Sequence, residues 1–263
     1  MEPPRPYAVS LTLADLPDEV RAMLAADTPL QEPPRQGRTS RVAFALDASG
    51  RPVVLKRSVG PHLEVIRREH RALCAVHPLG VPAPEPLLFL ERAASAGLEG
   101  WLMTRRLPGI TLEAALGAEL DRAGRTALLT NFGAHLARLH ATPPPPGLGG
   151  HDCLETVLAS ARRLNPAADV ARFDPRRNRP PAPVALAFIH GDLFLVNVMT
   201  EGGRVTGLID WSFAEVGDPR SDVAVAMHGL TRADQAAFAE GYGPAGRLTP
   251  AEAAYFVELA LLF

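Results

Sequence analysis

Residues 188–211 constrain the fold of this chain more than any other stretch. Two apolar runs, at 195–200 and 204–209, have the length and composition of β-strands. The residues between them, E-G-G at 201–203, are typical of a tight turn. Glycine favours such turns because it adopts positive φ angles at little cost. The sequence therefore predicts a β-hairpin over 195–209.

The predicted hairpin brings three polar residues toward one edge. Asp192 lies just before it, Asn197 lies near the start of its first strand, and Asp210 follows its second strand. Two carboxylates and an amide oxygen are hard ligands that suit Mg²⁺, and such a group of residues also suits a hydroxyl that must lose a proton. We therefore take this edge as the candidate site.

The order of these residues resembles the catalytic segment of protein kinases, in which H-R-D is followed by four residues, an asparagine and later D-F-G. Here H-G-D ends at Asp192, four residues separate it from Asn197, and I-D-W surrounds Asp210. These forms resemble the aminoglycoside phosphotransferase and choline kinase branch of the kinase-like fold. Residues 217–224, G-D-P-R-S-D-V-A, also resemble its G-D-P-x-x-D-L-A segment. Four elements in this order argue against unrelated acidic turns on a β protein.

The resemblance covers residues 37–245 and implies an α+β, protein kinase-like bilobal fold. A small antiparallel β lobe with one main helix is expected at 1–103, followed by a hinge at 104–107. A larger helical lobe, with the catalytic loop and the acceptor site, is expected at 108–263. Members of this family usually continue with further helix beyond the segment that ends here at Phe263.

Lys56 and Glu69 are predicted to form an ion pair. Lys56 closes the β-branched run at 53–55 and resembles the lysine of the kinase V-A-I-K strand, although its residue type alone would favour a solvated lysine. In the helix predicted at 62–77, Glu69 falls on the apolar stripe, where a carboxylate needs a partner because burying it alone is costly. Glu64 points to the opposite, solvated face and is the weaker candidate.

Two further nucleotide contacts are assigned to a loop and a hinge. The loop at 37–40 enters the first predicted hairpin, and its backbone N–H groups together with Ser40 could cover phosphates. An ordinary hairpin explains the same residues equally well from the sequence alone. Residues 103–109 resemble the hinge of the family, where backbone groups bind adenine, and Met103 is assigned there by position.

The resemblance implies a small-molecule kinase, that is, a phosphotransferase with an alcohol group as acceptor, which uses ATP or GTP and Mg²⁺. Asp192 would orient the acceptor hydroxyl and take its proton. Asn197 and Asp210 would hold the Mg²⁺ on the phosphates. Lys56, held by Glu69, would fix the phosphate tail.

Four other polar residues are expected to have supporting roles. His190 would brace the catalytic loop, and Asp218 and Asp222 would accept hydrogen bonds from its backbone. Asp218 followed by proline is also a good helix start. His140, at the end of a helix expected at 125–140, is expected to be hydrogen-bonded rather than a ligand.

Composition narrows the class of partner. The net charge of −2 provides no basic field for nucleic acid. No uncharged apolar run approaches the length of a membrane span, and the N-terminus has no apolar signal core. We therefore expect a cytoplasmic protein that binds a small hydroxyl-bearing acceptor and neither nucleic acid nor membrane. The sequence indicates no oligomeric state.

Charge also bears on the acceptor. Residues 150–183, expected to form one wall of its pocket, contain six arginines and four acids. Polycationic aminoglycosides need acidic walls, so this excess favours a neutral or anionic acceptor. Solvent-facing arginines would explain the composition equally well, and acids of the C-terminal helices could supply the opposite wall.

Two other functional classes fit parts of the sequence. A metal-dependent phosphohydrolase would use four ligands, His190, Asp192, Asp210 and His228. It would leave Asn197 and the Lys56–Glu69 pair without a role. A non-catalytic nucleotide-binding module is the second alternative, but such modules usually lose the base, the metal ligand or the lysine, and all three are present here.

Overall fold

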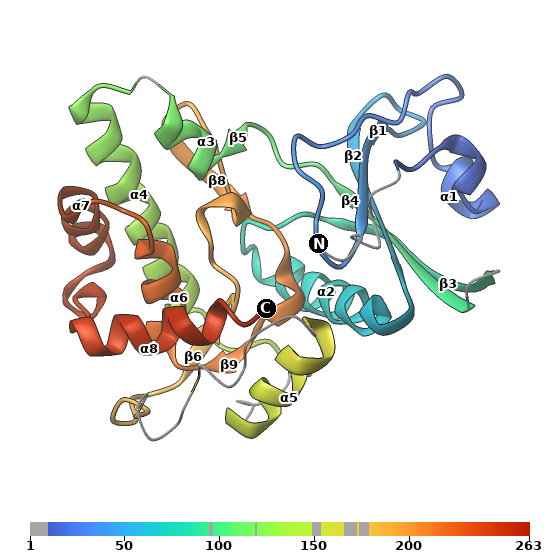
Figure 1. Ribbon diagram of the computed structural model, residues 1–263. Coiled ribbons are helices and arrows are strands. Elements are labelled where there is room, and N and C mark those ends of the chain that lie inside the picture. The colour runs from blue at the N-terminus through green and yellow to red at the C-terminus, as the bar shows by residue number, and fades with distance from the viewer. Residues whose placement is uncertain (1–9, 95–96, 119, 149–153, 166–172, 174–178) are drawn as a thin grey trace, which may run out of the picture. The chain divides into compact units, whose positions relative to one another are not determined.

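The computed structural model describes residues 10–94, 97–118, 120–148, 154–165, 173 and 179–263 (Figure 1). The chain forms two compact units. The first unit combines Met1–Cys74 with Pro84–Arg106, and the second unit combines Ala75–Ala83 with Leu107–Phe263. The sequence predicts a first lobe that ends at 103 and a second lobe that begins at 108. In the structure the first unit extends to Arg106, and Ala75–Ala83 belongs to the second unit.

The first unit contains a four-stranded antiparallel sheet in the order β1-β2-β4-β3. Its strands are β1 (Arg41–Leu46), β2 (Pro52–Val59), β3 (Pro86–Ala94) and β4 (Gly97–Arg105). The predicted hairpin of β1 and β2 is present, and its turn contains Gly50 with φ 78°. Such a positive φ suits glycine because it has no Cβ.

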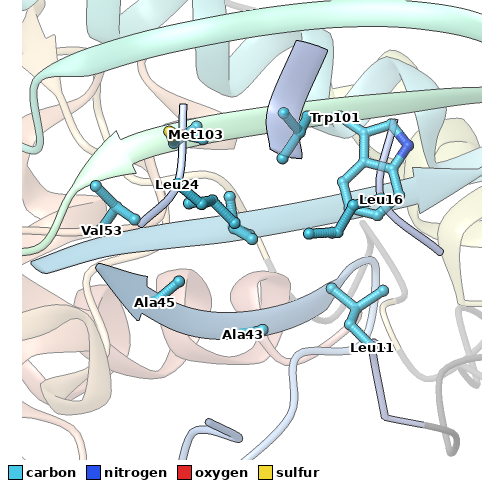
Figure 2. Packing of buried hydrophobic residues seen from close by; sticks show 10 residues of the cluster. Leu11, Leu16, Leu24, Ala43, Ala45, Val53, Trp101 and Met103 are labelled. Carbon is cyan, nitrogen blue, oxygen red and sulfur yellow. The ribbon is translucent and has the colours of Figure 1, made fainter. Parts of the chain in front are cut away.

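One face of this sheet packs on the segment before it. Leu11, Leu16, Val20 and Leu24 form a buried core with the strand residues Ala43, Ala45, Val53, Leu55, Trp101 and Met103 (Figure 2). The single helix expected over 13–26 is instead a 3₁₀ turn, Leu13–Asp15, and a short helix, α1 (Asp18–Ala22). Proline explains this correction, because Pro17 disfavours helical geometry at the residue before it.

The opposite face carries α2 (Leu63–Val76), which confirms the helix predicted at 62–77. Gly100 of β4 permits the close approach of this helix. A Cβ at Gly100 would lie 2.6 Å from Leu63 Cδ1 and 3.1 Å from Ile66 Cγ2. Side chains alternate between the faces of a strand, so Lys56 and Leu55 of β2 lie on opposite faces.

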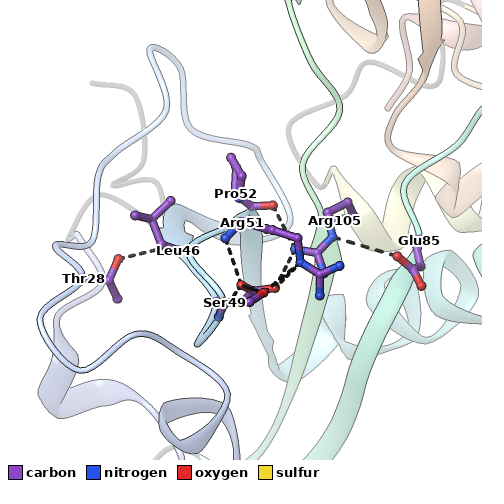
Figure 3. Close-up of polar contacts among 8 residues, drawn as sticks. Thr28, Leu46, Ser49, Arg51, Pro52, Glu85 and Arg105 are labelled. Carbon is purple, nitrogen blue, oxygen red and sulfur yellow. Dashed lines mark hydrogen bonds and ion pairs between the residues drawn. The ribbon is translucent and has the colours of Figure 1, made fainter.

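A buried carboxylate fixes the end of β4 to the β1–β2 turn (Figure 3). Asp47 accepts hydrogen bonds from the backbone N–H of Ser49 and of Arg51, both at 2.9 Å, and Arg105 Nη1 donates to it at 2.8 Å. The hydrogen bond from the Ser49 hydroxyl, followed by the other donors, holds the pKa of Asp47 well below its usual range. These contacts anchor Arg105, which lies within the hinge expected at 104–107.

The second unit is mainly helical. Its helices are α3 (Leu112–Gly117), α4 (Arg122–Ala141), α5 (Leu154–Leu164), α6 (Pro219–Met227), α7 (Arg232–Tyr242) and α8 (Pro250–Ala260). Helices α4 and α7 lie side by side (Figure 1). Two glycines allow this contact: a Cβ on Gly133 would lie 2.0 Å from Phe238 O, and one on Gly241 would lie 1.9 Å from Thr130 O. Across the described residues, no helix combines the length and apolarity that a membrane span requires.

Short strands complete the second unit. One sheet has the order β5 (Ile110–Thr111), β7 (Val198–Glu201) and β8 (Arg204–Leu208), and β6 (Ala187–Ile189) pairs with β9 (Glu215–Gly217). The predicted hairpin over 195–209 is present, and Gly202 and Gly203 both have positive φ, as a type I′ turn requires. Its first strand starts later than expected, because Leu195–Asn197 forms a 3₁₀ turn.

Candidate active site

The H-G-D turn follows β6 and depends on its central glycine. Gly191 has φ 81°, and a Cβ there would lie 2.2 Å from Phe213 O. Any other residue would therefore meet both backbone strain and a backbone clash. The turn places Asp192 at the start of the candidate site.

Asn197 is bonded directly to Asp192. Its Nδ2 donates to Asp192 O at 2.8 Å and to Asp192 Oδ2 at 2.9 Å. The side chain is buried, and both amide hydrogens are used in these bonds. Oδ1 of Asn197 is therefore the atom of this amide that can bind a further group.

The residue before Asp210 is held on both sides. The backbone N–H of Ile209 donates to Asn197 O at 2.9 Å, and His190 Nε2 lies 2.9 Å from Ile209 O. Asp210 itself has φ 69° and ψ 58°, and it is the one non-glycine residue with positive φ in the described part of the chain. Such strain persists where neighbours fix the backbone, commonly at functional sites. The backbone of Asp210 therefore follows directly on a residue bonded to Asn197, and Asn197 is itself bonded to Asp192.

His190 braces this arrangement, as expected. The backbone N–H of Asp192 donates to His190 Nδ1 at 3.3 Å, so Nε2 carries the hydrogen that Ile209 O accepts. The imidazole packs edge-on against Trp211, with ring centroids 4.8 Å apart. Trp211 Nε1 donates to Leu208 O at 2.8 Å, which anchors the indole to β8.

The Asp222 carboxylate holds the backbone of the H-G-D turn through two hydrogen bonds. This buried carboxylate accepts from the N–H groups of His190 and Gly191 at 2.7 Å and 2.9 Å, as predicted. Burial alone would raise the pKa of Asp222, but the hydrogen bond from His140 and the backbone donors hold it below its usual value. Asp218 does not share this role: it caps α6 through the N–H of Arg220 at 2.9 Å.

The predicted ion pair of the first unit is also present. Lys56 Nζ lies 2.6 Å and 2.9 Å from the two carboxylate oxygens of Glu69, whose side chain is 4% exposed. Glu64 instead pairs with Arg71 at 2.6 Å. Lys56 and Glu69 belong to the first unit, whereas Asp192, Asn197 and Asp210 belong to the second.

At the other two assigned contacts, Met103 and Ser40, the side chains are buried. Met103 is buried in the core on the sheet face opposite Lys56, so its side chain is not available to a nucleotide (Figure 2). Ser40 is buried as well, and its hydroxyl lies 2.7 Å from Ser58 Oγ. Only the backbone at these two positions remains a candidate for nucleotide contact.

Sequence reasoning missed one residue that the structure connects to the site. Tyr242 Oη lies 2.7 Å from His140 Nδ1, and His140 Nε2 lies 3.2 Å from Asp222 Oδ2. His140 is therefore hydrogen-bonded, as expected. Tyr242 lies 102 positions away from His140, and neither the spacing nor the local pattern indicates such a contact.

The oxygen donors of the second unit suit a hard divalent cation. Asn197 Oδ1 and the Asp210 carboxylate fit Mg²⁺, which is usually held by one or two protein ligands, waters and phosphate oxygens. No cluster of three or more histidine, cysteine or acidic residues suited to a metal occurs among the described residues. The ligand set of a phosphohydrolase is therefore not supported, and both ring nitrogens of His190 are already in hydrogen bonds.

Comparison with known proteins identifies the family of this chain. Residues 31–256 match the family described as the phosphotransferase enzyme family. The chain belongs to this family. A curated relative, acyl-CoA dehydrogenase family member 11 of Gallus gallus, is 30% identical over 207 residues, which are 71% of this chain and 26% of that protein. The chain thus spans about a quarter of the length of the first curated relatives that it matches.

Solved structures confirm the protein kinase-like α+β fold. An aminoglycoside-3'-phosphotransferase of type VIII matches with a TM-score of 0.72 and 22% identity, over 90% of this chain and 94% of that one. A macrolide 2'-phosphotransferase from Brachybacterium faecium matches with a TM-score of 0.56 and 24% identity, over 89% and 83% of the two chains.

Two further matches were solved with nucleotides. One is a thermostable mutant of an aminoglycoside phosphotransferase with ADP and hygromycin B, which has a TM-score of 0.64, 17% identity and coverage of 90% and 84%. The other is the GDP complex of an aminoglycoside 2'-phosphotransferase mutant, with a TM-score of 0.64, 16% identity and coverage of 89% and 82%.

Proposed function

We propose that this phosphotransferase is a small-molecule kinase that moves the γ-phosphoryl group of ATP or GTP to a hydroxyl group of a small acceptor. The observation that carries the proposal is the pair of hydrogen bonds from Asn197 Nδ2 to Asp192. These bonds join the candidate base to a candidate metal ligand and leave the amide oxygen for a cation. The nucleotide complexes of structural neighbours support the choice of nucleotide.

Each residue has a defined part in this reaction. Asp192 orients the acceptor hydroxyl and takes its proton as the oxygen attacks the γ-phosphorus. Asn197 Oδ1 and the Asp210 carboxylate would hold Mg²⁺, which neutralises negative charge on the phosphates. Lys56, oriented by Glu69, contributes a second positive charge to the phosphate tail.

The acceptor is proposed to be neutral or anionic rather than a polycation. The support is the excess of arginines in residues 150–183, where 149–153, 166–172 and 174–178 lie outside the described residues. The names of similar proteins suggest several alcohols to test, because they refer to aminoglycosides, macrolides and acyl-CoA compounds. A hydroxyacyl coenzyme A thioester would be the anionic member of such a set.

The test is a nucleotide-consumption screen read by mass spectrometry. ATP and GTP are incubated with Mg²⁺ and a panel containing kanamycin, a macrolide, homoserine, choline and a hydroxyacyl coenzyme A. We expect one acceptor other than kanamycin to gain a phosphoryl group, and the Asp192→Asn variant to form little product. Free phosphate without a phosphorylated acceptor across a wide panel would contradict the proposal and favour hydrolysis. Efficient, salt-sensitive phosphorylation of kanamycin would contradict only the proposal of a neutral or anionic acceptor, and the proposed kinase activity would stand.

A further inference from the structure

Tyr242 is connected to the catalytic loop by a chain of hydrogen bonds within the second unit. Its Oη lies 2.7 Å from His140 Nδ1, and His140 Nε2 lies 3.2 Å from Asp222 Oδ2. Asp222 in turn accepts from the backbone N–H of His190 and Gly191 at 2.7 Å and 2.9 Å. These bonds join the end of α7, through α4 and α6, to the H-G-D turn.

With a neutral His140, the chemistry of the three side chains gives the direction of each bond. Asp222 has its pKa held low and, when ionised, can only accept, so His140 must donate to it from Nε2. A neutral imidazole with its hydrogen on Nε2 accepts at Nδ1, so Tyr242 must donate there. Burial, together with nearby acids, raises the pKa of Tyr242 to about 12, which keeps this donor protonated at neutral pH.

We infer that Tyr242 is a positioning residue, which holds the ring of His140 against Asp222 and thereby fixes the backbone of the H-G-D turn. Asp222 already selects the tautomer with the hydrogen on Nε2, so the hydroxyl of Tyr242 acts on the orientation of the ring. Without that hydroxyl, Nδ1 is a buried acceptor that has lost its donor, and the imidazole can turn toward another donor, which weakens its bond to Asp222. The effect on turnover, though not the hydrogen-bond network, rests on the proposed function.

A substitution can separate this role from simple packing. The ring of Tyr242 packs edge-on against His140, with centroids 5.7 Å apart, and stacks on Phe238 at 6.0 Å. Tyr242→Phe keeps both ring contacts and removes only the hydroxyl. Tyr255→Phe is the matched control, because Tyr255 of α8 is also buried and packs on Phe256, but makes none of the bonds to the loop described above.

The first measurement needs no nucleotide. Histidine ¹⁵N NMR reports the hydrogen bond from His140 Nε2 to Asp222, and amide hydrogen exchange reports the bond from Gly191 to Asp222. We expect Tyr242→Phe to shift the Nε2 resonance of His140 and to speed exchange at Gly191 roughly fivefold or more, the scale of one lost hydrogen bond. Tyr255→Phe should change neither. An unchanged Nε2 resonance with unchanged exchange in Tyr242→Phe would overturn the inference.

The second measurement follows turnover in a double-mutant cycle with His140→Gln, whose amide can still donate to Asp222 but offers Tyr242 no ring nitrogen. Tyr242→Phe should lower kcat roughly tenfold in the wild-type background, with the KM for nucleotide changed by less than about twofold. In the His140→Gln background it should have little further effect. Equal losses in both backgrounds would overturn the inference. If the wild-type protein transfers no phosphate, the proposed function fails, and the NMR and exchange results still decide whether Tyr242 positions the turn.

Discussion

At the scale of single residues, backbone conformation explains the residue types around the candidate site. Gly191 has a positive φ and contacts backbone, so no side chain fits there. Asp210 adopts a left-handed conformation despite its side chain, and the bonds on both sides of Ile209 hold it in place. The motif indicates both residues, but the sequence does not show which atoms restrain them.

Gly191→Ala should be more destabilising than an alanine at a glycine with similar φ but open surroundings. The new Cβ would lie 2.2 Å from Phe213 O, whereas Gly80, with φ 69°, has nothing within 4 Å of the same position. We expect roughly 3 kcal/mol for Gly191→Ala against roughly 1 kcal/mol for Gly80→Ala. Urea unfolding measures both free energies of unfolding. Equal losses of stability in the two variants would contradict the prediction, because they would show that the structure relieves the clash at Gly191.

His135 should make the stability depend on pH. Burial, with a smaller contribution from Arg138, lowers its pKa to about 4 from an ordinary value of 6.5. Between these two pH values the unfolded state binds more protons at His135 than the folded state does, so protonation favours unfolding. The stability that a neutral His135 provides is therefore fully present above about pH 6.5 and is lost as the pH falls toward 4. We expect a loss of up to ~3 kcal/mol over this range. Unfolding free energies of the wild type and His135→Leu test this, and identical pH slopes would contradict it.

At the scale of elements, local patterns predict those parts that local interactions determine. The stripe of apolar residues predicts α2, and two glycines predict the turn between β7 and β8. The expected helix over 13–26 fails because Pro17 interrupts it. The side chains of Ser40 and Met103 are turned inward by loop packing and strand alternation, which position in a motif does not reveal.

The Lys56–Glu69 pair links β2 to α2 and can be tested as a unit. Glu69→Ala removes a buried partner of Lys56, and we expect the unfolding free energy to fall by roughly 3 kcal/mol. The double variant Lys56→Met/Glu69→Leu should recover part of that stability, because it buries no charge. Its affinity for Mg·ATP should stay low, since the phosphate-binding charge is absent. Chemical denaturation and calorimetry measure the two effects, and wild-type nucleotide affinity in the double variant would exclude the proposed role of Lys56.

At the scale of the whole molecule, the order of motifs indicates the family, but long-range contacts need the structure. The spacing from Asp192 to Asn197 and Asp210 follows from the hairpin and can be read along the chain. The bonds from Tyr242 to His140 and from His140 to Asp222 join residues 102 and 82 positions apart. No periodicity or turn signal encodes such pairs, because they arise from the packing of α4, α6 and α7.

The most direct test of the central claim is the turnover of Asp192→Asn with the acceptor found in the screen. This change preserves the size and shape of the side chain but removes the proton acceptor. We predict that kcat falls by roughly 10²-fold or more while the affinity for Mg·ATP changes little, because a general base acts on the chemical step and Lys56, Asn197 and Asp210 are unaltered. Near wild-type turnover in Asp192→Asn would contradict the account.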